Sequence, residues 1–417
     1  MAIWHINGGH KLKGSCFVQG SKNAALPVIT ASVISGGVTE LLNVPQLSDI
    51  TNTLRILRQL GCVAEQQGND VYIDSTCLSS NTVPAEMMEK MRSSVLFMGA
   101  LLARCGEVHL TNPGGCKIGA RPVDLHISAM KALGAKVEEN GCEIVCKADK
   151  LKGAHIELPF PSVGATENAM IAACMADGET VISGAAKEPE IVDLQEYLRK
   201  KGAYIYGAGT ERISINGFEK SKHCGHRIIP DRIVASSLLC AAAAAGGDIE
   251  LRGVDLKEFS CLQHFLNEAG CDIILNQRSI RLVSDGRLRS VSDVVTAPYP
   301  GFPTDAQPLL MAALLKADGK TEFTENIFDS RYCHARELSR FGADITVNGR
   351  NATVWGVKSL NGATVTATDL RGGAAMIIAG LSANGKTEVV DTGHIFRGYE
   401  NFDYKLRSLG ADVYMEI

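Results

Sequence analysis

Several features are missing from this 417-residue sequence, and each absence excludes a class of protein. Lysine and arginine total 42 against 46 for aspartate and glutamate, so there is no basic excess and no nucleic-acid surface is expected. The longest apolar runs, such as 238–245 and 374–381, are far shorter than the roughly 20 residues of a membrane-spanning helix. The first residues lack a charged segment followed by an apolar run, so we expect no signal peptide.

Cysteine is plentiful but lacks the spacings that define metal or disulfide motifs. The 13 cysteines are scattered from Cys16 to Cys333, with no C-x-x-C pair and no Cys/His zinc spacing. This pattern favours reduced thiols in a cytoplasmic protein, and we expect no metal and no cofactor. The length favours two domains of roughly 200 residues each, and we expect a monomer.

Glycine is abundant, with 42 residues, and its placement is periodic. A Leu-Gly-Ala-like triplet closes an amphipathic segment six times, with central glycines at positions 61, 134, 202, 270, 342 and 410. A second set precedes them and begins β-rich stretches, at positions 37, 106, 178, 247, 319 and 385. The sequence therefore predicts six α/β repeats, three in each domain.

Each repeat is expected to read helix, strand, helix, strand. The segment 191–201 has apolar residues at helical spacing and ends at Gly202, and 203–206 and 212–215 alternate like paired strands. Helices such as 170–175 and 238–245 are apolar almost all round, so they should lie beneath the sheets. The repeat alone leaves open a plain α/β protein without a special site.

The run 113–126 places one thiol in a glycine-rich, cation-flanked loop. Its glycines allow backbone N–H groups to approach a bound anion, and Lys117 and Arg121 flank Cys116. Nearby cations lower a thiol pKa, so Cys116 could act as a nucleophile or a proton donor near neutral pH. A structural turn with an idle cysteine is the alternative.

Charged residues that occur in one repeat only are further candidates for a site. Lys22 and Asn23 stand directly before an apolar helix, where an anion is favoured, although Ser-Lys-Asn is also an ordinary helix cap. Arg92 opens the second repeat in a similar way, and alone would be a solvated surface residue.

The last two repeats contribute a carboxylate and three arginines. Asp305 opens the fifth repeat, as either a helix cap or a group that orients a substrate hydroxyl. Arg331, Arg371 and Arg397 supply the forked donors that carboxylates and phosphates prefer. A cleft lined by both halves of the chain is the expected arrangement.

The motifs also carry a resemblance that covers nearly the whole chain. They occupy residues 20–27, 113–126, 162–168, 186–193, 230–232, 302–305 and 369–371. Together they resemble the family of bacterial UDP-N-acetylglucosamine 1-carboxyvinyltransferases. The resemblance implies the enolpyruvyl transferase fold, an α/β class with a two-domain inside-out barrel of six repeats. It implies one domain over residues 22–229 and a second over 1–21 with 230–417.

The resemblance implies a reaction and a role for several residues. The family moves the enolpyruvyl group of phosphoenolpyruvate to the 3′-hydroxyl of UDP-N-acetylglucosamine, without a cofactor, as the first committed step of peptidoglycan synthesis. Cys116 matches the proton donor that also forms a covalent adduct and reacts with fosfomycin. Lys22, Arg121 and Arg397 match the residues that hold the phosphate. Arg331 and Arg371 match those near the carboxylate, and Asp305 matches the group that orients or deprotonates the sugar hydroxyl.

The resemblance also implies that Asp369, near Arg371, contacts substrate. The last group that it implies consists of the nucleotide-sugar contacts. The matched positions are Asn23, Arg92, Arg121, Pro122, Val123, Asp124, Leu125, Phe160, Ser162, Val163 and Ile327.

Some positions depart from the family pattern. Gly372 and Gly373 replace residues with side chains, which predicts a looser helix start, and Cys333 flanks His334 atypically. These departures leave the proposed catalytic groups in place. Two other functions stay open: the sister transferase acting on shikimate 3-phosphate, and a non-catalytic or weakly active paralogue that binds the nucleotide sugar.

Overall fold

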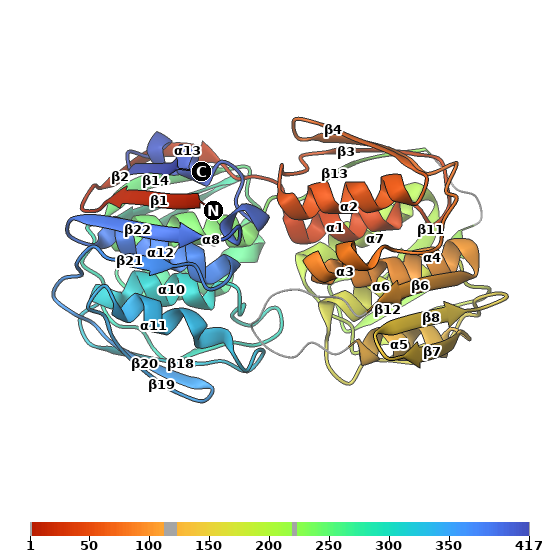
Figure 1. Ribbon diagram of the computed structural model, residues 1–417. Coiled ribbons are helices and arrows are strands. Elements are labelled where there is room, and N and C mark those ends of the chain that lie inside the picture. Colours follow the sequence, from red (N-terminus) through yellow and green to blue (C-terminus); the bar gives the residue numbers. More distant parts are fainter. Residues whose placement is uncertain (1, 112–122, 219–222, 417) are drawn as a thin grey trace. The chain divides into compact units, whose positions relative to one another are not determined.

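The computed structural model describes residues 2–111, 123–218 and 223–416, which divide into two compact units (Figure 1). The described part of unit 1 contains the residues up to Gln19 and those from Pro230 onward. The described part of unit 2 lies between Gly20 and Ile229. Unit 2 is therefore an insertion in unit 1. Within unit 1, Asp231 N–H donates a hydrogen bond to the Gln19 carbonyl at 2.8 Å.

Unit 2 alternates helices and strands along the chain. Its elements are α1 (Lys22–Ala31), β3 (Val38–Leu42), α2 (Ser48–Gln59), β4 (Val63–Gln67), β5 (Asp70–Asp74), α3 (Ala85–Lys90), η1 (Arg92–Leu96), α4 (Phe97–Cys105), β6 (Glu107–Thr111), α5 (Asp124–Ala132), β7 (Lys136–Asn140), β8 (Glu143–Lys147), β9 (His155–Glu157), α6 (Val163–Ala173), β10 (Thr180–Ser183), α7 (Pro189–Lys201), β11 (Ala203–Tyr206), β12 (Arg212–Phe218) and β13 (Cys224–Arg227).

Unit 1 begins with two strands and resumes after the insertion. Its elements are β1 (Ala2–Asn7), β2 (Leu12–Phe17), α8 (Arg232–Ala245), β14 (Gly247–Arg252), η2 (Leu256–Phe259), α9 (Ser260–Glu268), β15 (Asp272–Asn276), β16 (Ser279–Ser284), β17 (Val294–Val295), α10 (Gln307–Ala313), η3 (Leu314–Lys316), β18 (Lys320–Thr324), η4 (Arg331–His334), α11 (Ala335–Ser339), β19 (Asp344–Asn348), β20 (Asn351–Trp355), β21 (Thr364–Thr366), α12 (Leu370–Ser382), β22 (Lys386–Asp391), η5 (Ile395–Arg397), α13 (Phe402–Ser408) and β23 (Asp412–Glu416).

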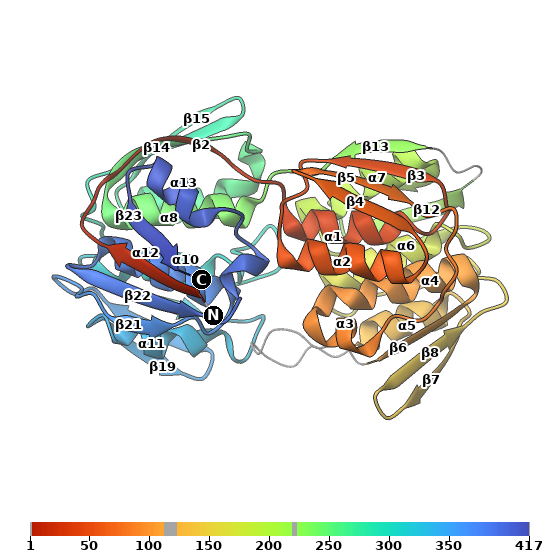
Figure 2. The ribbon, with the colours of Figure 1, turned by 45° about the horizontal axis from the view of Figure 1, so that its top comes forward.

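The described strands form three small sheets in each unit. Unit 2 has the orders β13-β3-β5-β4, β6-β8-β7 and β11-β12-β10-β9, and unit 1 has β15-β16-β14-β2, β17-β18-β20-β19 and β21-β22-β1-β23. Edge strands such as β2 and β21 pair in parallel, whereas the hairpin strands pair antiparallel. Next to β6, a single parallel bridge from Thr82 to His109 stands where the other sheets have an edge strand. Figure 2 shows β1 between β22 and β23.

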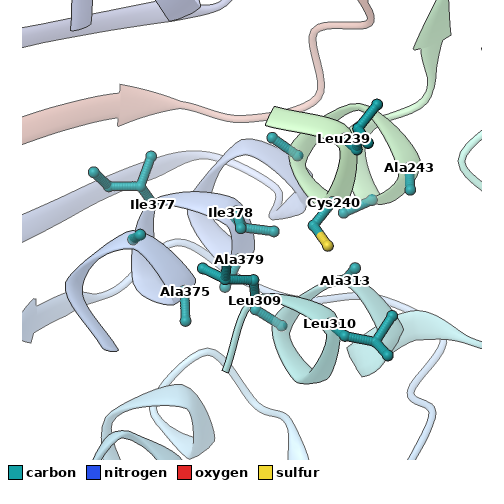
Figure 3. Close-up of a cluster of buried hydrophobic side chains, with 14 of the residues drawn as sticks. Leu239, Cys240, Ala243, Leu309, Leu310, Ala313, Ala375, Ile377, Ile378 and Ala379 are labelled. Atoms are coloured by element: carbon teal, nitrogen blue, oxygen red, sulfur yellow. The ribbon is translucent and has the colours of Figure 1, made fainter. Parts of the chain in front are cut away.

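Inner helices form the core of each unit, as their apolar composition predicts. In unit 1, α8, α10 and α12 pack on one another through Leu, Ile and Ala side chains (Figure 3). Small residues such as Ala243 and Ala379 let these helices approach closely, and every residue of α8 from Ile233 to Ala244 is buried. In unit 2, α4 packs on α6 in the same way. The expected burial is confirmed for residues 170–174 and 238–244, whereas Met175 lies after the end of α6 and is exposed, and Ala245 is half-buried.

The six repeat glycines end the outer helices in left-handed backbone conformation. Their φ angles lie between 88° at Gly342 and 113° at Gly202, a range that favours glycine because it has no Cβ. The strands 203–206 and 212–215 pair antiparallel as predicted. The periodicity therefore reports a local backbone requirement that recurs six times in the described chain.

Candidate active site

In unit 2, Lys22 forms a buried ion pair with Asp49. Ser21 caps α1 by accepting from Ala24 N–H at 3.3 Å, which places Lys22 at the first position of the helix. The Lys22 Nζ donates to Asp49 Oδ2 at 3.0 Å, and both residues are more than nine-tenths buried. The prediction that this segment caps a helix is thus confirmed for Ser21. The Lys22 ammonium is buried within the unit, and a buried cation needs a carboxylate partner such as Asp49.

A second group in unit 2 brings Arg92 near His126. Asn168 donates through Nδ2 to the Val95 carbonyl and to His126 Nδ1, both at 3.0 Å. Its Oδ1 accepts from Gly99 N–H at 2.7 Å. Burial, and then the nearby Arg92 charge, lower the pKa of His126 to about 4. Because Nδ1 accepts a hydrogen bond, this neutral imidazole carries its proton on Nε2.

Glycine at position 164 brings the start of α6 against the same imidazole. A Cβ at Gly164 would lie 3.2 Å from His126 Cε1, so the ring lies against the backbone of the helix start. Ser162 caps α6 by accepting from Ala165 N–H at 3.4 Å. Arg92, the start of α5 and the start of α6 are therefore neighbours. This proximity brings together sequence positions that are about 70 residues apart.

The other predicted contacts in unit 2 lie at exposed or half-buried helix starts. Asn23 and Asp124 are exposed, Val123 and Leu125 are half-buried at the beginning of α5, and Val163 is half-buried at that of α6. Phe160 is 45% exposed, beside Ser162. Cys116, Arg121 and Pro122 lie outside the described residues, so their predicted roles remain predictions.

In unit 1, one carboxylate joins two buried arginines. Arg331 Nη2 donates to Asp305 Oδ1 at 3.1 Å, and Arg371 Nε donates to Asp305 Oδ2 at 3.2 Å. The side chains of Arg331 and Arg371 are 2% and 3% exposed, whereas that of Asp305 is 30% exposed. Since α10 begins after Ala306 without a side-chain cap, the alternative of Asp305 as a helix cap is wrong.

Arg371 lies in a polar network that keeps its charge. Burial opposes the charged form, but Tyr399, Asp305 and Asp231 raise the pKa of Arg371 above its usual value. The guanidinium carbon lies 5.4 Å from the centre of the Tyr399 ring, and the Tyr399 hydroxyl is 2.8 Å from Ser237 Oγ. Burial raises the pKa of Tyr399, so its hydroxyl stays protonated.

The start of α12 is tightly packed, which corrects the prediction of a loose helix. Asp369 Oδ1 accepts from Arg371 N–H at 3.0 Å and from Gly372 N–H at 3.2 Å. A Cβ at Gly372 would come within 2.7 Å of Asp369 Oδ2, and one at Gly373 within 2.7 Å of Ile395 Cγ1. The glycines are therefore explained by close approach: the space for a side chain is taken.

His334 lies fully buried against this helix start. Its Nδ1–H donates to the Arg331 carbonyl at 3.0 Å, and Nε2 has no hydrogen-bond partner among the described residues. Burial is the main cause that lowers the pKa of His334 to about 4, and Arg331 lowers it further while Asp369 opposes the shift. The imidazole is thus neutral beside the Arg331 guanidinium, where a further positive charge would be unfavourable.

Ile327 is tied to the Asp305 segment through a buried glutamate. Glu325 Oε1 accepts from Ile327 N–H at 2.8 Å and from Phe328 N–H at 3.1 Å. Its Oε2 accepts from Thr304 Oγ1 at 3.0 Å, next to Asp305. A predicted nucleotide-sugar contact and the predicted hydroxyl-orienting group are thus held together within unit 1.

Arg397 ends the short helix η5 and is half-buried. The buried Asp391 accepts from Gly393 and His394 N–H through Oδ1, at 3.0 and 2.7 Å, and from Ile395 N–H through Oδ2 at 3.1 Å. A Cβ at Gly398 would lie 2.8 Å from the Leu370 side chain, so the segment packs against the residue before Arg371. Arg397 and Arg371 therefore lie on neighbouring segments.

Sequence reasoning missed several residues that hold the predicted ones in place. Asp49, Asn168, Glu325, Tyr399 and Asp391 were not singled out. The signal for Asn168 was an amide that follows Thr166 and Glu167 inside a mostly apolar helix, and that for Tyr399 was its position two residues after Arg397. Nothing local marks Asp49 as the partner of Lys22, because the two are joined only by folding.

Within residues 2–111, 123–218 and 223–416, no three His, Cys, Asp or Glu side chains are arranged to hold a metal ion. The helices of these same ranges are too short or too polar to cross a membrane.

Comparison with known proteins defines the class. Residues 6–406 match the model of the family described as EPSP synthase (3-phosphoshikimate 1-carboxyvinyltransferase). The structure of the enolpyruvyl transferase NikO from Streptomyces tendae is similar, with a TM-score of 0.89, 23% identity and 99% and 98% of the two chains covered. EPSP synthase from Acinetobacter baumannii gives a TM-score of 0.78 at 20% identity over 100% of each chain. The fold is that of the enolpyruvyl transferases.

More similar sequences narrow the family. The UDP-N-acetylglucosamine 1-carboxyvinyltransferase of Geobacter metallireducens is 46% identical, over 98% of each chain. UDP-N-acetylglucosamine 1-carboxyvinyltransferase 1 of Staphylococcus epidermidis is 47% identical, also over 98% of each chain. The chain belongs to the family of UDP-N-acetylglucosamine 1-carboxyvinyltransferases.

Proposed function

We propose that this enzyme transfers the enolpyruvyl group of phosphoenolpyruvate to the 3′-hydroxyl of UDP-N-acetylglucosamine and releases phosphate. The observation that carries the proposal is the Asp305 carboxylate held by Arg331 and Arg371. It combines an oxygen acceptor, 30% exposed, with two buried guanidinium groups. Such an arrangement suits a hydroxyl donor beside a small, doubly anionic substrate.

The proposed reaction is an addition followed by an elimination. The 3′-oxygen forms a bond to C2 of phosphoenolpyruvate while C3 gains a proton, and the hydroxyl proton leaves toward Asp305. The intermediate then loses phosphate from C2 and a proton from C3, which restores the double bond. By resemblance, Cys116 supplies the C3 proton and forms a covalent adduct, and Lys22, Arg121 and Arg397 bind the phosphate. No step calls for a cofactor.

We assign the nucleotide sugar to the group around Arg92 in unit 2, and Ile327 is a further contact that the resemblance implies. Arg92 supplies a cation near the starts of α5 and α6, where backbone N–H groups favour a diphosphate. The exposed Asn23 and Phe160 add an amide and an aromatic face. The names of relatives in two genera support this acceptor over shikimate 3-phosphate.

We place the reaction in the cytoplasm, as the first committed step of peptidoglycan synthesis. The cysteines of the described ranges are free thiols, which is typical of a reducing compartment.

A phosphate-release assay tests the proposal. Purified enzyme receives phosphoenolpyruvate with either UDP-N-acetylglucosamine or shikimate 3-phosphate. We expect phosphate only with the nucleotide sugar. Release only with shikimate 3-phosphate would assign the sister activity, and no release with either would favour a binding protein without turnover.

A further inference from the structure

Gln19 is the last residue of unit 1 before the chain passes into unit 2. It is 5% exposed, although it is a polar residue at a point where the chain leaves a compact unit. Its carbonyl accepts from Asp231 N–H, at the second passage of the chain between the units. Buried amides of this kind are expected to be fully hydrogen-bonded.

The Gln19 side chain pairs with the backbone directly after Arg397. Nε2 donates to the Gly398 carbonyl at 3.2 Å, and Oε1 accepts from Glu400 N–H at 2.9 Å. A primary amide presents a donor and an acceptor side by side, so it pairs with the two peptide groups that flank Tyr399 as a β-strand would. Oε1 also accepts from Lys405 Nζ at 3.2 Å, which completes its hydrogen bonds.

These bonds fix the far end of the segment that carries Arg397, residues 395–400. Asp391 holds the near end through three N–H groups, the last being that of Ile395. Within the segment, Gly398 N–H and Tyr399 N–H both donate to the Ile395 carbonyl at 3.0 Å. Arg397 therefore lies between two anchors, and only the Gln19 anchor belongs to the passage between the units.

We propose that Gln19 is a positioning residue for Arg397 that links the backbone at the chain passage to the phosphate-binding arginine. The inference rests on the proposed role of Arg397 in phosphoenolpyruvate binding. A change of backbone conformation at residues 18–20 is transmitted through one rigid amide to residues 398–400. A displacement of about 1 Å of a charged contact is enough to reduce catalysis strongly.

The chemistry of the side chain is specific enough to test. Gln19→Met keeps length and volume but removes the donor and the acceptor. Gln19→Glu keeps the acceptor for Glu400 N–H and strengthens the contact with Lys405, but replaces the donor to the Gly398 carbonyl by a repulsive oxygen. Gln195→Met is the matched control, because Gln195 is a buried glutamine of unit 2 whose Oε1 accepts from Ala208 N–H at 3.0 Å.

The experiment measures steady-state kinetics and backbone hydrogen exchange on the full chain. We expect Gln19→Met to raise KM for phosphoenolpyruvate about tenfold while KM for the nucleotide sugar changes less than about twofold. Amides of residues 395–400 should exchange faster in this variant. Gln19→Glu should show a smaller change in both measurements, and Gln195→Met should leave both unchanged.

Three results would overturn the proposal. One is unchanged exchange at 395–400 in both Gln19 variants, and another is faster exchange with an unchanged KM for phosphoenolpyruvate. An equal rise of both KM values would show a general structural effect instead. If the wild-type enzyme releases no phosphate, the proposed function fails, while the exchange comparison still tests whether Gln19 anchors the Arg397 segment. If Gln19→Met does not fold, Gln19→Glu carries both measurements.

Discussion

Arg371 donates to Asp305 across 66 positions of the chain, at 3.2 Å from Nε to Oδ2. The arginine is almost fully buried and the carboxylate is the partner that reaches solvent. The pair therefore presents an acceptor oxygen outward and keeps the balancing charge inside. This arrangement holds the carboxylate in one orientation at a surface where a free side chain would rotate.

The first prediction concerns the charge of Asp305. Asp305→Asn keeps the shape but loses a carboxylate oxygen that can accept a proton, so we expect the rate of phosphate release to fall about 100-fold or more. Asp255→Asn is the control, since Asp255 accepts from Lys257 N–H at an exposed turn and should leave the rate unchanged. A rate for Asp305→Asn within about threefold of wild type would contradict the assigned role.

The second prediction concerns the buried pair of Lys22 and Asp49. Asp49→Asn removes the charge that balances Lys22, and we expect the free energy of unfolding to fall by about 2 kcal/mol or more, because an unpaired buried charge is costly. KM for phosphoenolpyruvate should change as well. Urea unfolding measures the first effect. Asp177→Asn, which breaks an exposed pair with Lys150, should cost less than about 1 kcal/mol. Equal costs for the two variants would argue against a special role for burial at Asp49.

The third prediction follows from the close packing at Gly373. A Cβ there meets Ile395 at the start of the Arg397 segment, so Gly373→Ala should lower the free energy of unfolding by about 1–3 kcal/mol and raise KM for phosphoenolpyruvate. Gly225→Ala in β13 is the control, because a Cβ there meets nothing within 4 Å. A neutral Gly373→Ala variant would mean that α12 and η5 can shift apart freely.

The fourth prediction is acid sensitivity from His126 and His334. The folded pKa of each is about 4, below the unfolded value of about 6.5, so the unfolded chain binds more protons between these values. The contribution of each neutral histidine to the free energy of unfolding is therefore fully present above about pH 6.5. It is lost as the pH drops toward 4, by up to about 3 kcal/mol per histidine. His126→Gln should flatten this fall in urea unfolding, and His264→Gln, at an exposed position, should not. The same pH slope in wild type and His126→Gln would remove His126 as a cause.

The fifth prediction concerns the thiol of Cys116 and follows from its glycine-rich, cation-flanked sequence. We expect the intact mass of the wild-type protein to increase by one molecule of fosfomycin after treatment, and that of Cys116→Ser to stay unchanged. The comparison needs the variant because other thiols are exposed: Cys77, Cys105, Cys142 and Cys333. Modification of Cys116→Ser to the same extent would place the reactive thiol elsewhere.

The fold could be predicted to the extent that its signals are local. Gly202 and its five equivalents mark helix ends because a left-handed residue is needed there whatever surrounds it. The candidate groups at Lys22, Asp305 and Arg371 were found because charge stood out among apolar repeats. Their partners were not found, because the contacts of Asp49 and Tyr399 depend on how distant segments pack. The two glycines after Arg371 misled in part for the same reason. The tight surroundings of Gly373 come from the distant Ile395, whereas those of Gly372 come from the nearby Thr368 and Asp369 and, less closely, from His334.

The strand β1 lies between β22 and β23, whose residues are 386–391 and 412–416. During synthesis, β1 therefore emerges long before either neighbour, whereas all strands of unit 2 have left the ribosome soon after residue 229. Unit 2 can therefore complete its core before β23, the last strand of unit 1, has been synthesised. The apolar face of β1, with Trp4 and Ile6, stays without its sheet partners for most of translation, so this strand depends on protection from aggregation during that time.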